Sequence, residues 1–242
     1  MTVRTGKPAA RLPDGIRIYA IGDVHGRADL LDRVFSRIDA DLAASPTRRA
    51  IHVFLGDYVD RGPASRGVLD RLIDRNYSHE AVFLMGNHEV MLLEFFHNPA
   101  VLKHWRQYGG LDTLMSYGLS APFNANAEQL TVLAAALDKA MPAEHHSFLN
   151  QLVPSFSCGN FFFVHAGVRP GVPLTDQRQE DLVWIRDEFL QHQRGFGKVI
   201  VHGHTPVPEP DIRFNRINID TGAYATGRLT CLILEGDQMW FI

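Results

Sequence analysis

The sequence predicts an α/β protein that forms one domain, with polar residues gathered at the carboxyl ends of its strands. Three observations lead to this fold class. Short apolar runs alternate with segments of helical periodicity over roughly the first hundred residues. Each of the first three apolar runs ends in a glycine that is followed at once by polar residues. The last third of the chain is instead rich in runs of β-forming residues.

Length and composition favour a single globular domain. The 242 residues suffice for one substantial α/β core. The formal net charge of -3 argues against a broad polyanion-binding surface, so we expect no nucleic-acid polymer as a partner. The two cysteines, Cys158 and Cys231, are too few for a disulfide scaffold and are expected to be reduced. No segment resembles a signal peptide or a membrane span, which predicts a cytoplasmic protein.

The first hundred residues predict three strands, each followed by a helix. The strands are expected at Ile16–Ile21, Ile51–Leu55 and Ala81–Met85. The helices are expected at Ala28–Leu42, Ser65–Ile73 and Glu89–Phe96. Right-handed crossovers make such strands parallel, and the loops at their carboxyl ends then converge on one edge of the sheet. Residues 1–15 contain no apolar run, so we expect a loose tail there and a domain that spans 16–242.

The second half of the chain predicts a helical excursion and then a return to strands. Helical periodicity over about residues 97–151, clearest in Leu130–Leu137 and His145–Leu152, is interpreted as an excursion from the sheet. Later strands are expected at Phe161–Val164, Val199–Val201, Ile217–Ile219 and Leu229–Leu234. A short helix is expected between them at Leu182–Leu190.

Five polar motifs follow predicted strands, and together they predict a metal site. They are Gly22-Asp23-Val24-His25-Gly26, Gly56-Asp57-Tyr58-Val59-Asp60-Arg61-Gly62, Gly86-Asn87-His88-Glu89, Val164-His165-Ala166-Gly167 and Val201-His202-Gly203-His204-Thr205. Aspartate, asparagine and neutral histidine suit divalent ions such as Mn, Fe or Zn. One such motif alone is weak evidence, but five in order, each after a β-type run, are hard to explain as coincidence.

The motifs GDxHG, GDxVDRG and GNHE resemble those of the calcineurin-like metallophosphoesterase superfamily. More closely, they resemble its phosphoprotein phosphatase branch, which includes bacterial serine/threonine protein phosphatases. The resemblance runs from about Ile16 to the end of the chain. It implies a four-layered α/β/β/α sandwich, with two mostly β layers inside, helices outside and metals at the sheet edge. It also implies two divalent metal ions per chain, with Mn as the first choice and Fe or Zn as alternatives.

The same resemblance implies a ligand set for the two ions. One residue, Asp57, is expected to bridge them. The remaining ligands are Asp23 and His25 for the first ion, and Asn87, His165 and His204 for the second.

The resemblance also implies residues that act on the substrate. His88 resembles the general acid that protonates the leaving oxygen, and Asp60 resembles the carboxylate that orients it. Arg61 and Arg186 resemble phosphate-binding arginines, whose planar fork suits phosphate oxygens. Asn87 is expected to contact the phosphate as well as the second ion.

Several positions depart from the family pattern or allow two interpretations. Met85 stands where the branch often has an arginine, so one phosphate contact is expected to be missing or supplied elsewhere. Pro206 stands where many superfamily members have a further histidine, which predicts a water-rich first metal site. Strand alternation points His202 and His204 to one face, so His202 either touches metal or substrate or supports the ligands. The stretch 220–223 is either a simple turn or part of the active-site edge.

The activity implied is hydrolysis of phosphate monoesters by a metal-bridging hydroxide, with phosphoserine and phosphothreonine in proteins as first-choice substrates. The alternative is hydrolysis of dinucleoside polyphosphates such as diadenosine tetraphosphate, because bacterial enzymes of that kind share these motifs. A nucleotidase or phosphodiesterase comes third. A dinucleotide needs aromatic or apolar walls for its bases, whereas a phosphopeptide needs an open, shallow groove. A non-catalytic metal-binding module would have lost ligands, and all six are present.

Overall fold

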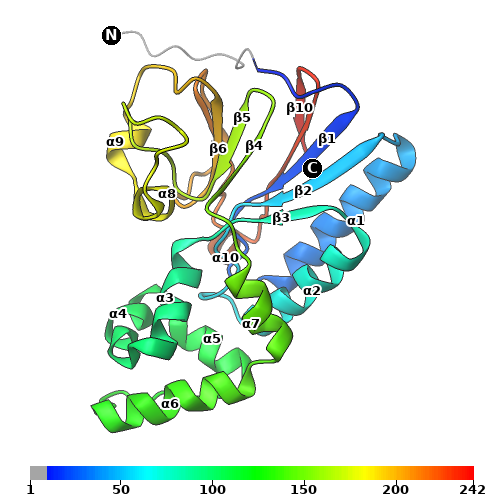
Figure 1. The fold of residues 1–242 in the computed structure, drawn as a ribbon. Coiled ribbons are helices and arrows are strands. Elements are labelled where there is room, and N and C mark those ends of the chain that lie inside the picture. Colours follow the sequence, from blue (N-terminus) through cyan, green and yellow to red (C-terminus); the bar gives the residue numbers. More distant parts are fainter. Residues whose placement is uncertain (1–9) are drawn as a thin grey trace.

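The computed structural model describes residues 10–242 and packs two five-stranded sheets against each other, with helices on both outer sides (Figure 1). The first sheet has the order β10-β9-β1-β2-β3 and the second β4-β5-β6-β8-β7. The predicted four-layered α/β/β/α arrangement is confirmed. Within residues 10–242, no helix is both long enough and apolar enough to cross a bilayer.

The strands and helices have the following bounds. The first sheet contains β1 (Ile16–Ile21), β2 (Arg49–Phe54), β3 (Ala81–Phe83), β9 (Cys231–Glu235) and β10 (Gln238–Phe241). The second contains β4 (Ser155–Cys158), β5 (Phe161–Val164), β6 (Val199–His202), β7 (Asp211–Ile212) and β8 (Arg216–Asn218). The helices are α1 (Ala28–Ala44), α2 (Ser65–Ser78), α3 (Asn87–His97), α4 (Leu102–Trp105), α5 (Gly110–Ser116), α6 (Ala127–Ala140), α7 (Ala143–Asn150), α8 (Gln179–Trp184), α9 (Asp187–Leu190) and α10 (Ala223–Thr226).

Strand β1 shows why the first apolar run has no polar alternation. Ile18 and Ala20 lie in the core between the two sheets, together with Phe163 of β5. Tyr19 and Ile21 point the opposite way, into the core beneath the helices. A strand buried on both faces needs apolar residues throughout. The predicted parallel pairing of β1 with β2 and of β2 with β3 is confirmed.

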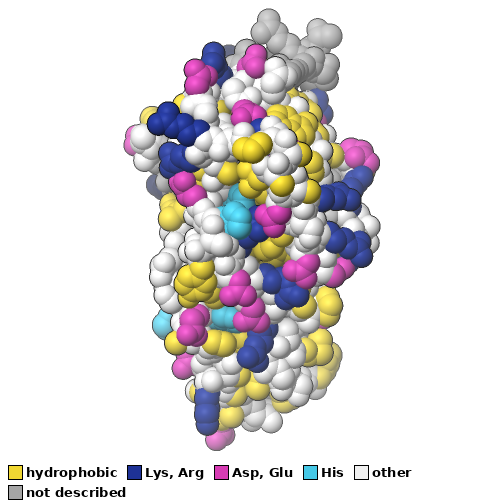
Figure 2. All heavy atoms as spheres, turned by 90° about the vertical axis from the view of Figure 1, so that its right-hand side faces the viewer, with side chains coloured by type: hydrophobic (Ala, Val, Ile, Leu, Met, Phe, Trp, Pro, Cys, Tyr) yellow, Lys and Arg dark blue, Asp and Glu magenta, His cyan; other side chains and the backbone are white. Residues whose placement is uncertain are grey.

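Helices cover the outer face of each sheet. Helices α1 and α2 lie against the first sheet, and α8 and α9 lie against the second (Figure 1). The surface on the side of α1 and α2 carries interspersed basic and acidic side chains (Figure 2). Some of them pair, as Arg71 does with Asp32. This face therefore shows no large surface of one charge.

The helical excursion extends below the sheets as α4 to α7 (Figure 1). Its buried residues Trp105, Leu114 and Leu133 belong to the same hydrophobic core as Phe54 of β2 and Leu69 of α2. The excursion is therefore packed as an extension of the first sheet's core.

Two details differ from the sequence-based expectation. Leu12 is buried and its backbone N–H donates to the carbonyl of Gly236, so ordered packing begins before residue 16. The remainder of the expected tail, residues 1–9, lies outside the described residues. The single helix expected over Leu182–Leu190 is two short helices, because the extended backbone of Ile185 and the non-helical backbone of Arg186 interrupt it.

Candidate metal centre

The polar motifs meet at one edge of the sheets, on loops with unusual backbone conformations. The non-glycine residues with positive φ in the described part of the chain are His25, Asp57, Asp60, Arg61 and His204. All five belong to the predicted motifs. Left-handed conformations are unfavourable for residues with a Cβ and persist where the surrounding structure enforces them. Their concentration here indicates that these loops are held in shapes that aim their side chains at a common point.

A glycine allows two of these loops to approach closely. A Cβ at Gly86 would lie 2.3 Å from the Asp57 carboxylate and 2.4 Å from the Asp57 backbone nitrogen. Any side chain there would separate the loop after β3 from the loop after β2. The glycine before Asn87 is thus required for the two motifs to share one site.

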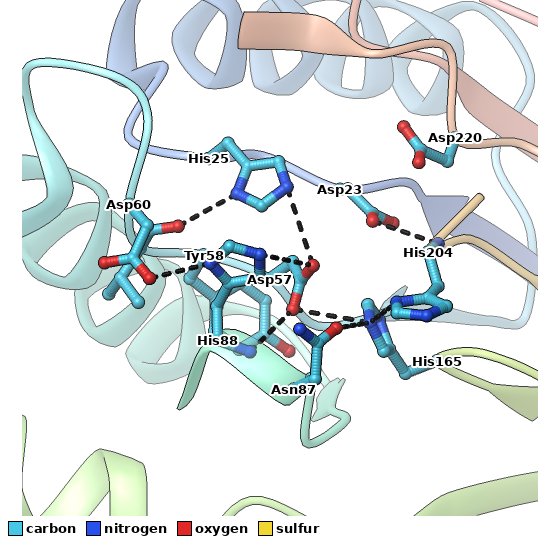
Figure 3. Close-up of polar contacts among 12 residues, drawn as sticks. Asp23, His25, Asp57, Tyr58, Asp60, Asn87, His88, His165, His204 and Asp220 are labelled. Atoms are coloured by element: carbon cyan, nitrogen blue, oxygen red, sulfur yellow. Dashed lines mark hydrogen bonds and ion pairs between the residues drawn. The ribbon is translucent and has the colours of Figure 1, made fainter. Parts of the chain in front are cut away.

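Asp57 lies at the centre of the site, with its two carboxylate oxygens facing different sides (Figure 3). One oxygen is 3.3 Å from Nε2 of His165. The other is 3.5 Å from Nε2 of His25 and 3.7 Å from Nε2 of His88. A carboxylate in this position can contact two cations at once.

On one side of Asp57, the ligands expected for the second ion come together. The side chains of Asp57, His165 and His204 bring their candidate ligand atoms within 4.8 Å of one another. The Asn87 amide oxygen lies 3.0 Å from His165 Nε2, which in turn is 3.2 Å from His204 Nδ1. All of these residues are buried. One carboxylate, one amide oxygen and two imidazoles make a donor set suited to a divalent ion.

On the other side, the grouping differs from the expected set. His25 and Asp57 form a close group with His88, and Asp23 is outside it. One carboxylate oxygen of Asp23 accepts the backbone N–H of His204 at 3.0 Å. The other oxygen is buried and has no hydrogen-bond partner among residues 10–242. Asp23 therefore lies at the site with one oxygen unused.

Hydrogen bonds to backbone carbonyls fix the tautomers of two imidazoles. His25 Nδ1 donates to the Val59 carbonyl at 3.0 Å, and His165 Nδ1 donates to the Leu55 carbonyl at 2.9 Å. Burial lowers the pKa of His25 to about 3 and also lowers the pKa of His165, so both rings are neutral near pH 7. Their unprotonated Nε2 atoms then face Asp57 oxygens across 3.3–3.5 Å. Two lone-pair donors facing each other repel unless a cation lies between them.

The buried carboxylates of the site are also stabilised in their ionised form only by a nearby positive charge. Burial, together with the charges of Asp220 and Asp57, raises the pKa of Asp23. Burial raises the pKa of Asp220, which lies at the edge of the same site, to about 6 (Figure 3). Ionised carboxylates are costly to bury without a compensating charge. The unpaired Asp23 oxygen and this carboxylate cluster therefore fit a site for divalent cations.

His88 and Asp60 form a buried pair next to the centre. His88 Nδ1 lies 2.7 Å from the Asp60 carboxylate. Burial opposes the charged form of His88, but the charges of Asp57 and Asp60 outweigh it and raise the pKa. Because Nδ1 is engaged, Nε2 is the atom that faces the centre. A histidine held in this way can carry a proton to a substrate oxygen.

The two expected arginines lie on opposite flanks. The Arg61 guanidinium stacks over the Tyr224 ring at 4.6 Å, and this ring is edge-on to His25. Arg186 Nε lies 3.1 Å from His204 Nε2. The centre is therefore bordered by one arginine on the His25 side and one on the His204 side.

One important residue was not recognised as part of the site from the sequence. Glu89, expected only to begin a helix, is fully buried and accepts backbone N–H groups of Asp57, Tyr58, Val59 and Gly86. It therefore fixes the loop that carries Asp57 to the start of α3. The available signal was its place in GNHE, a carboxylate inside a motif of otherwise chemically active residues.

The positions that allowed two interpretations are now placed. His202 packs edge-on against Phe189, 4.9 Å between ring centres, and its Nδ1 lies 3.1 Å from the Gly203 carbonyl. It belongs to neither candidate ligand group. Asp220 faces the site, so the stretch after β8 is part of its edge (Figure 3). Met85 is buried.

Comparison with known proteins extends over most of the chain. It is 29% identical over 232 residues to the bis(5'-nucleosyl)-tetraphosphatase PrpE (asymmetrical) of Anoxybacillus flavithermus, covering 88% of each chain. The protein of the same name from Geobacillus thermodenitrificans is 28% identical over 240 residues, or 90% of each chain.

Solved structures share the fold. A candidate diadenosine tetraphosphatase superimposes with a TM-score of 0.66 and 20% identity, over 97% of this chain and 95% of that one. A cold-active protein-tyrosine phosphatase of a psychrophilic Shewanella gives a TM-score of 0.60 and 17% identity, over 96% and 80% of the two chains. The family model described as calcineurin-like phosphoesterase matches residues 16–232. The chain therefore belongs to the calcineurin-like phosphoesterase family.

Proposed function

We propose that this metallophosphoesterase hydrolyses dinucleoside polyphosphates, with dinucleoside tetraphosphates as the preferred class. The observation that carries the proposal is the similarity to bis(5'-nucleosyl)-tetraphosphatases along 88–90% of both chains. The first choice from sequence was phosphoserine and phosphothreonine in proteins. That choice has weaker support, because the curated relatives carry the other activity in their names.

A cavity beside the centre supports a nucleoside-containing substrate. It has a volume of about 690 Å³ and is lined by Trp184, Arg186, Arg178 and Glu180 among others. The Trp184 ring is edge-on to His204, with ring centres 6.1 Å apart. An aromatic wall next to the centre is the feature that separates a dinucleotide pocket from a simple phosphate pocket. A base that stacks on such a ring gains about 1–3 kcal/mol.

Polar groups around this cavity suit the rest of a nucleotide. Arg178 and Arg186 would hold phosphate oxygens, since guanidinium groups bind them through paired hydrogen bonds. Carboxylates such as Glu180 would accept hydrogen bonds from ribose hydroxyls, as acidic residues do in dinucleotide-binding proteins. The same carboxylates would also attract a basic peptide, so the test below includes one.

The chain's own residues would divide the work as follows. The candidate ligands for the ions are Asp23, His25, Asp57, Asn87, His165 and His204. When bound, two divalent cations supply Lewis acidity and lower the pKa of a water molecule. Arg61 and Arg186 would orient the phosphate and balance its charge. His88 would give a proton through Nε2 to the departing oxygen, because Nδ1 is held by Asp60.

A substrate panel in the presence of Mn tests this function. It compares a dinucleoside tetraphosphate, a phosphoserine peptide with basic flanks, a bis-ester and an aryl phosphate. We expect kcat/KM for the dinucleotide to exceed that for the peptide by at least about tenfold, equivalent to about 1.4 kcal/mol of transition-state binding. A peptide preferred over the dinucleotide would overturn the proposal in favour of a protein phosphatase.

Trp184 provides a variant that separates the nucleoside site from the chemistry. Trp184→Ala is expected to raise KM for the dinucleotide by about 5- to 100-fold through lost stacking, and to leave the aryl phosphate unchanged. Trp184→Phe, which keeps a π-face, is the matched control and should remain within about threefold of wild type. Equal losses on both substrates would show that the ring supports the centre without binding a base.

A further inference from the structure

We propose that Trp105 and Thr113, two residues of the helical excursion, are positioning residues that hold Asp60 and through it aim His88 at the leaving oxygen. The inference rests on the proposed function in one respect, the role of His88 as proton donor. It assigns to the excursion a part in the chemistry, beyond the core packing in which Trp105 also takes part.

The Asp60 carboxylate accepts hydrogen bonds from three side chains, and together these bonds fix its orientation. One oxygen accepts the Thr113 hydroxyl at 2.5 Å. The other accepts Trp105 Nε1–H at 2.6 Å and lies 2.7 Å from His88 Nδ1. Asp60, Trp105 and Thr113 are all fully buried, so water does not replace any of these bonds. Removing one donor therefore frees the carboxylate to turn and takes His88 with it.

Thr113 also supports the strained backbone of the same residue. Asp60 has a φ of +72°, and its backbone N–H is shared between Thr113 Oγ1 at 2.9 Å and Ser65 Oγ at 3.0 Å. The two hydroxyls are 3.0 Å apart. With Ser65 donating to Thr113, and Thr113 donating to the carboxylate, each hydroxyl gives its one proton. The network is complete, which makes it sensitive to the loss of the Thr113 oxygen.

Two adjacent glycines bring the excursion close enough to form these bonds. A Cβ at Gly110 would lie 2.4 Å from the Trp105 ring, and one at Gly109 would lie 2.4 Å from the Arg61 backbone nitrogen. The Arg61 N–H also donates to the Gly109 carbonyl at 3.3 Å. Residues 105–113 therefore wrap directly around Asp60 and the phosphate-binding arginine candidate.

Leaving-group dependence distinguishes positioning from structural support. A proton donor matters most when the leaving oxygen is strongly basic, as in phenyl phosphate, and least when it is weakly basic, as in 2,4-dinitrophenyl phosphate. Thr113→Val removes the hydroxyl at nearly constant volume, and Trp105→Phe removes the N–H but keeps an aromatic ring. We expect each variant to lower kcat for phenyl phosphate at least about tenfold and kcat for the dinitrophenyl ester at most about twofold, with KM unchanged.

Conservative and matched variants complete the experiment. Thr113→Ser keeps the hydroxyl and should restore most of the phenyl phosphate rate. Thr131→Val on α6 and Trp240→Phe on β10 make the same chemical changes at side chains that do not touch Asp60. These two variants should leave kcat for both esters unchanged. Thermal melting of each variant identifies any that is unfolded. Equal losses on both esters in folded variants would overturn the inference.

A double-mutant cycle keeps the inference testable even where a variant is destabilised. In an Asp60→Asn background, Thr113→Val should cause no further loss of kcat, because both changes break one linkage. If the double variant instead loses kcat by the product of the two single-variant factors, the two residues act independently and the inference is overturned. His88→Asn distinguishes failure of this inference from failure of the proposed function. If His88→Asn lowers kcat equally for phenyl phosphate and for the dinitrophenyl ester, His88 is not the proton donor. If the loss of kcat is larger for phenyl phosphate in His88→Asn but equal for both esters in the Thr113 and Trp105 variants, only the positioning role is contradicted.

Discussion

Asp57 presents its two carboxylate oxygens to histidines on opposite sides, and this arrangement makes it the residue on which both candidate ion sites depend. His165 faces one oxygen and His25 the other, each through a nitrogen that carries no proton. The side chain is buried, so its charge has no solvent to balance it. We expect a substitution here to affect both ions, whereas a change at His25 or His165 should affect one.

Asp57→Asn tests this dependence by metal analysis. The variant keeps the shape of the side chain but loses the charge and one strong donor. Metal content after dialysis against Mn is expected to fall from about two ions per chain to below about one. Asp14→Asn, at an exposed ion pair with Arg11, is the matched control and should keep both ions. If Asp57→Asn retains two tightly bound ions, the bridging role is wrong.

At the scale of elements, the side chain of Glu89 joins α3 to the loop after β2 through several backbone hydrogen bonds. Glu89 lies in the first turn of α3 and accepts four backbone N–H groups, three of them from residues 57–59. The helix therefore does more than follow β3: it holds the ligand loop of the neighbouring strand. This explains how a loop with a left-handed residue at Asp57 keeps its conformation.

Glu89→Gln is expected to weaken this junction. One carboxylate oxygen becomes an NH₂ group, which faces backbone donors and can accept none of their hydrogen bonds. The free energy of unfolding should fall by about 2–4 kcal/mol, since buried donors without acceptors cost about 1–3 kcal/mol each. Chemical denaturation measures this change. Glu94→Gln, the same change at an exposed position on α3, should shift stability by no more than about 0.5 kcal/mol. Equal stability of both variants would remove Glu89 from its supporting role.

Across the whole molecule, the sequence predicted those features that depend on local pattern. The glycine-punctuated strands and the order of the ligand motifs were readable because each ligand directly follows its own strand. The strands β4, β7 and β10 were missed, because polar residues leave them without the continuous apolar run that marks β5. The orientation of Asp23 was also not predictable, since it depends on a backbone N–H 181 residues away. Nor were the contacts of Trp105 and Thr113 with Asp60, which join segments 45 and 53 residues apart.

The same long-range organisation predicts that metal binding stabilises the whole fold. The candidate ligands extend from residue 23 to residue 204 and come from loops of both sheets. In the folded state they place buried carboxylates and unprotonated imidazole nitrogens next to one another, and the unfolded chain has no such site. Cations that bind only the folded chain shift the equilibrium toward it.

Differential scanning calorimetry of metal-free protein titrated with Mn measures this effect. With the ion at about 100 times its dissociation constant, each site adds about 2.7 kcal/mol, so the melting temperature should rise by about 5–20 °C for a chain of this size. Chelation should reverse the shift. Asp57→Asn, which lacks the shared ligand, should show less than half of it at the same Mn concentration. A melting temperature that does not respond to Mn would mean that the buried carboxylates are compensated within the protein itself, and the case for a divalent metal centre built from these residues would fail.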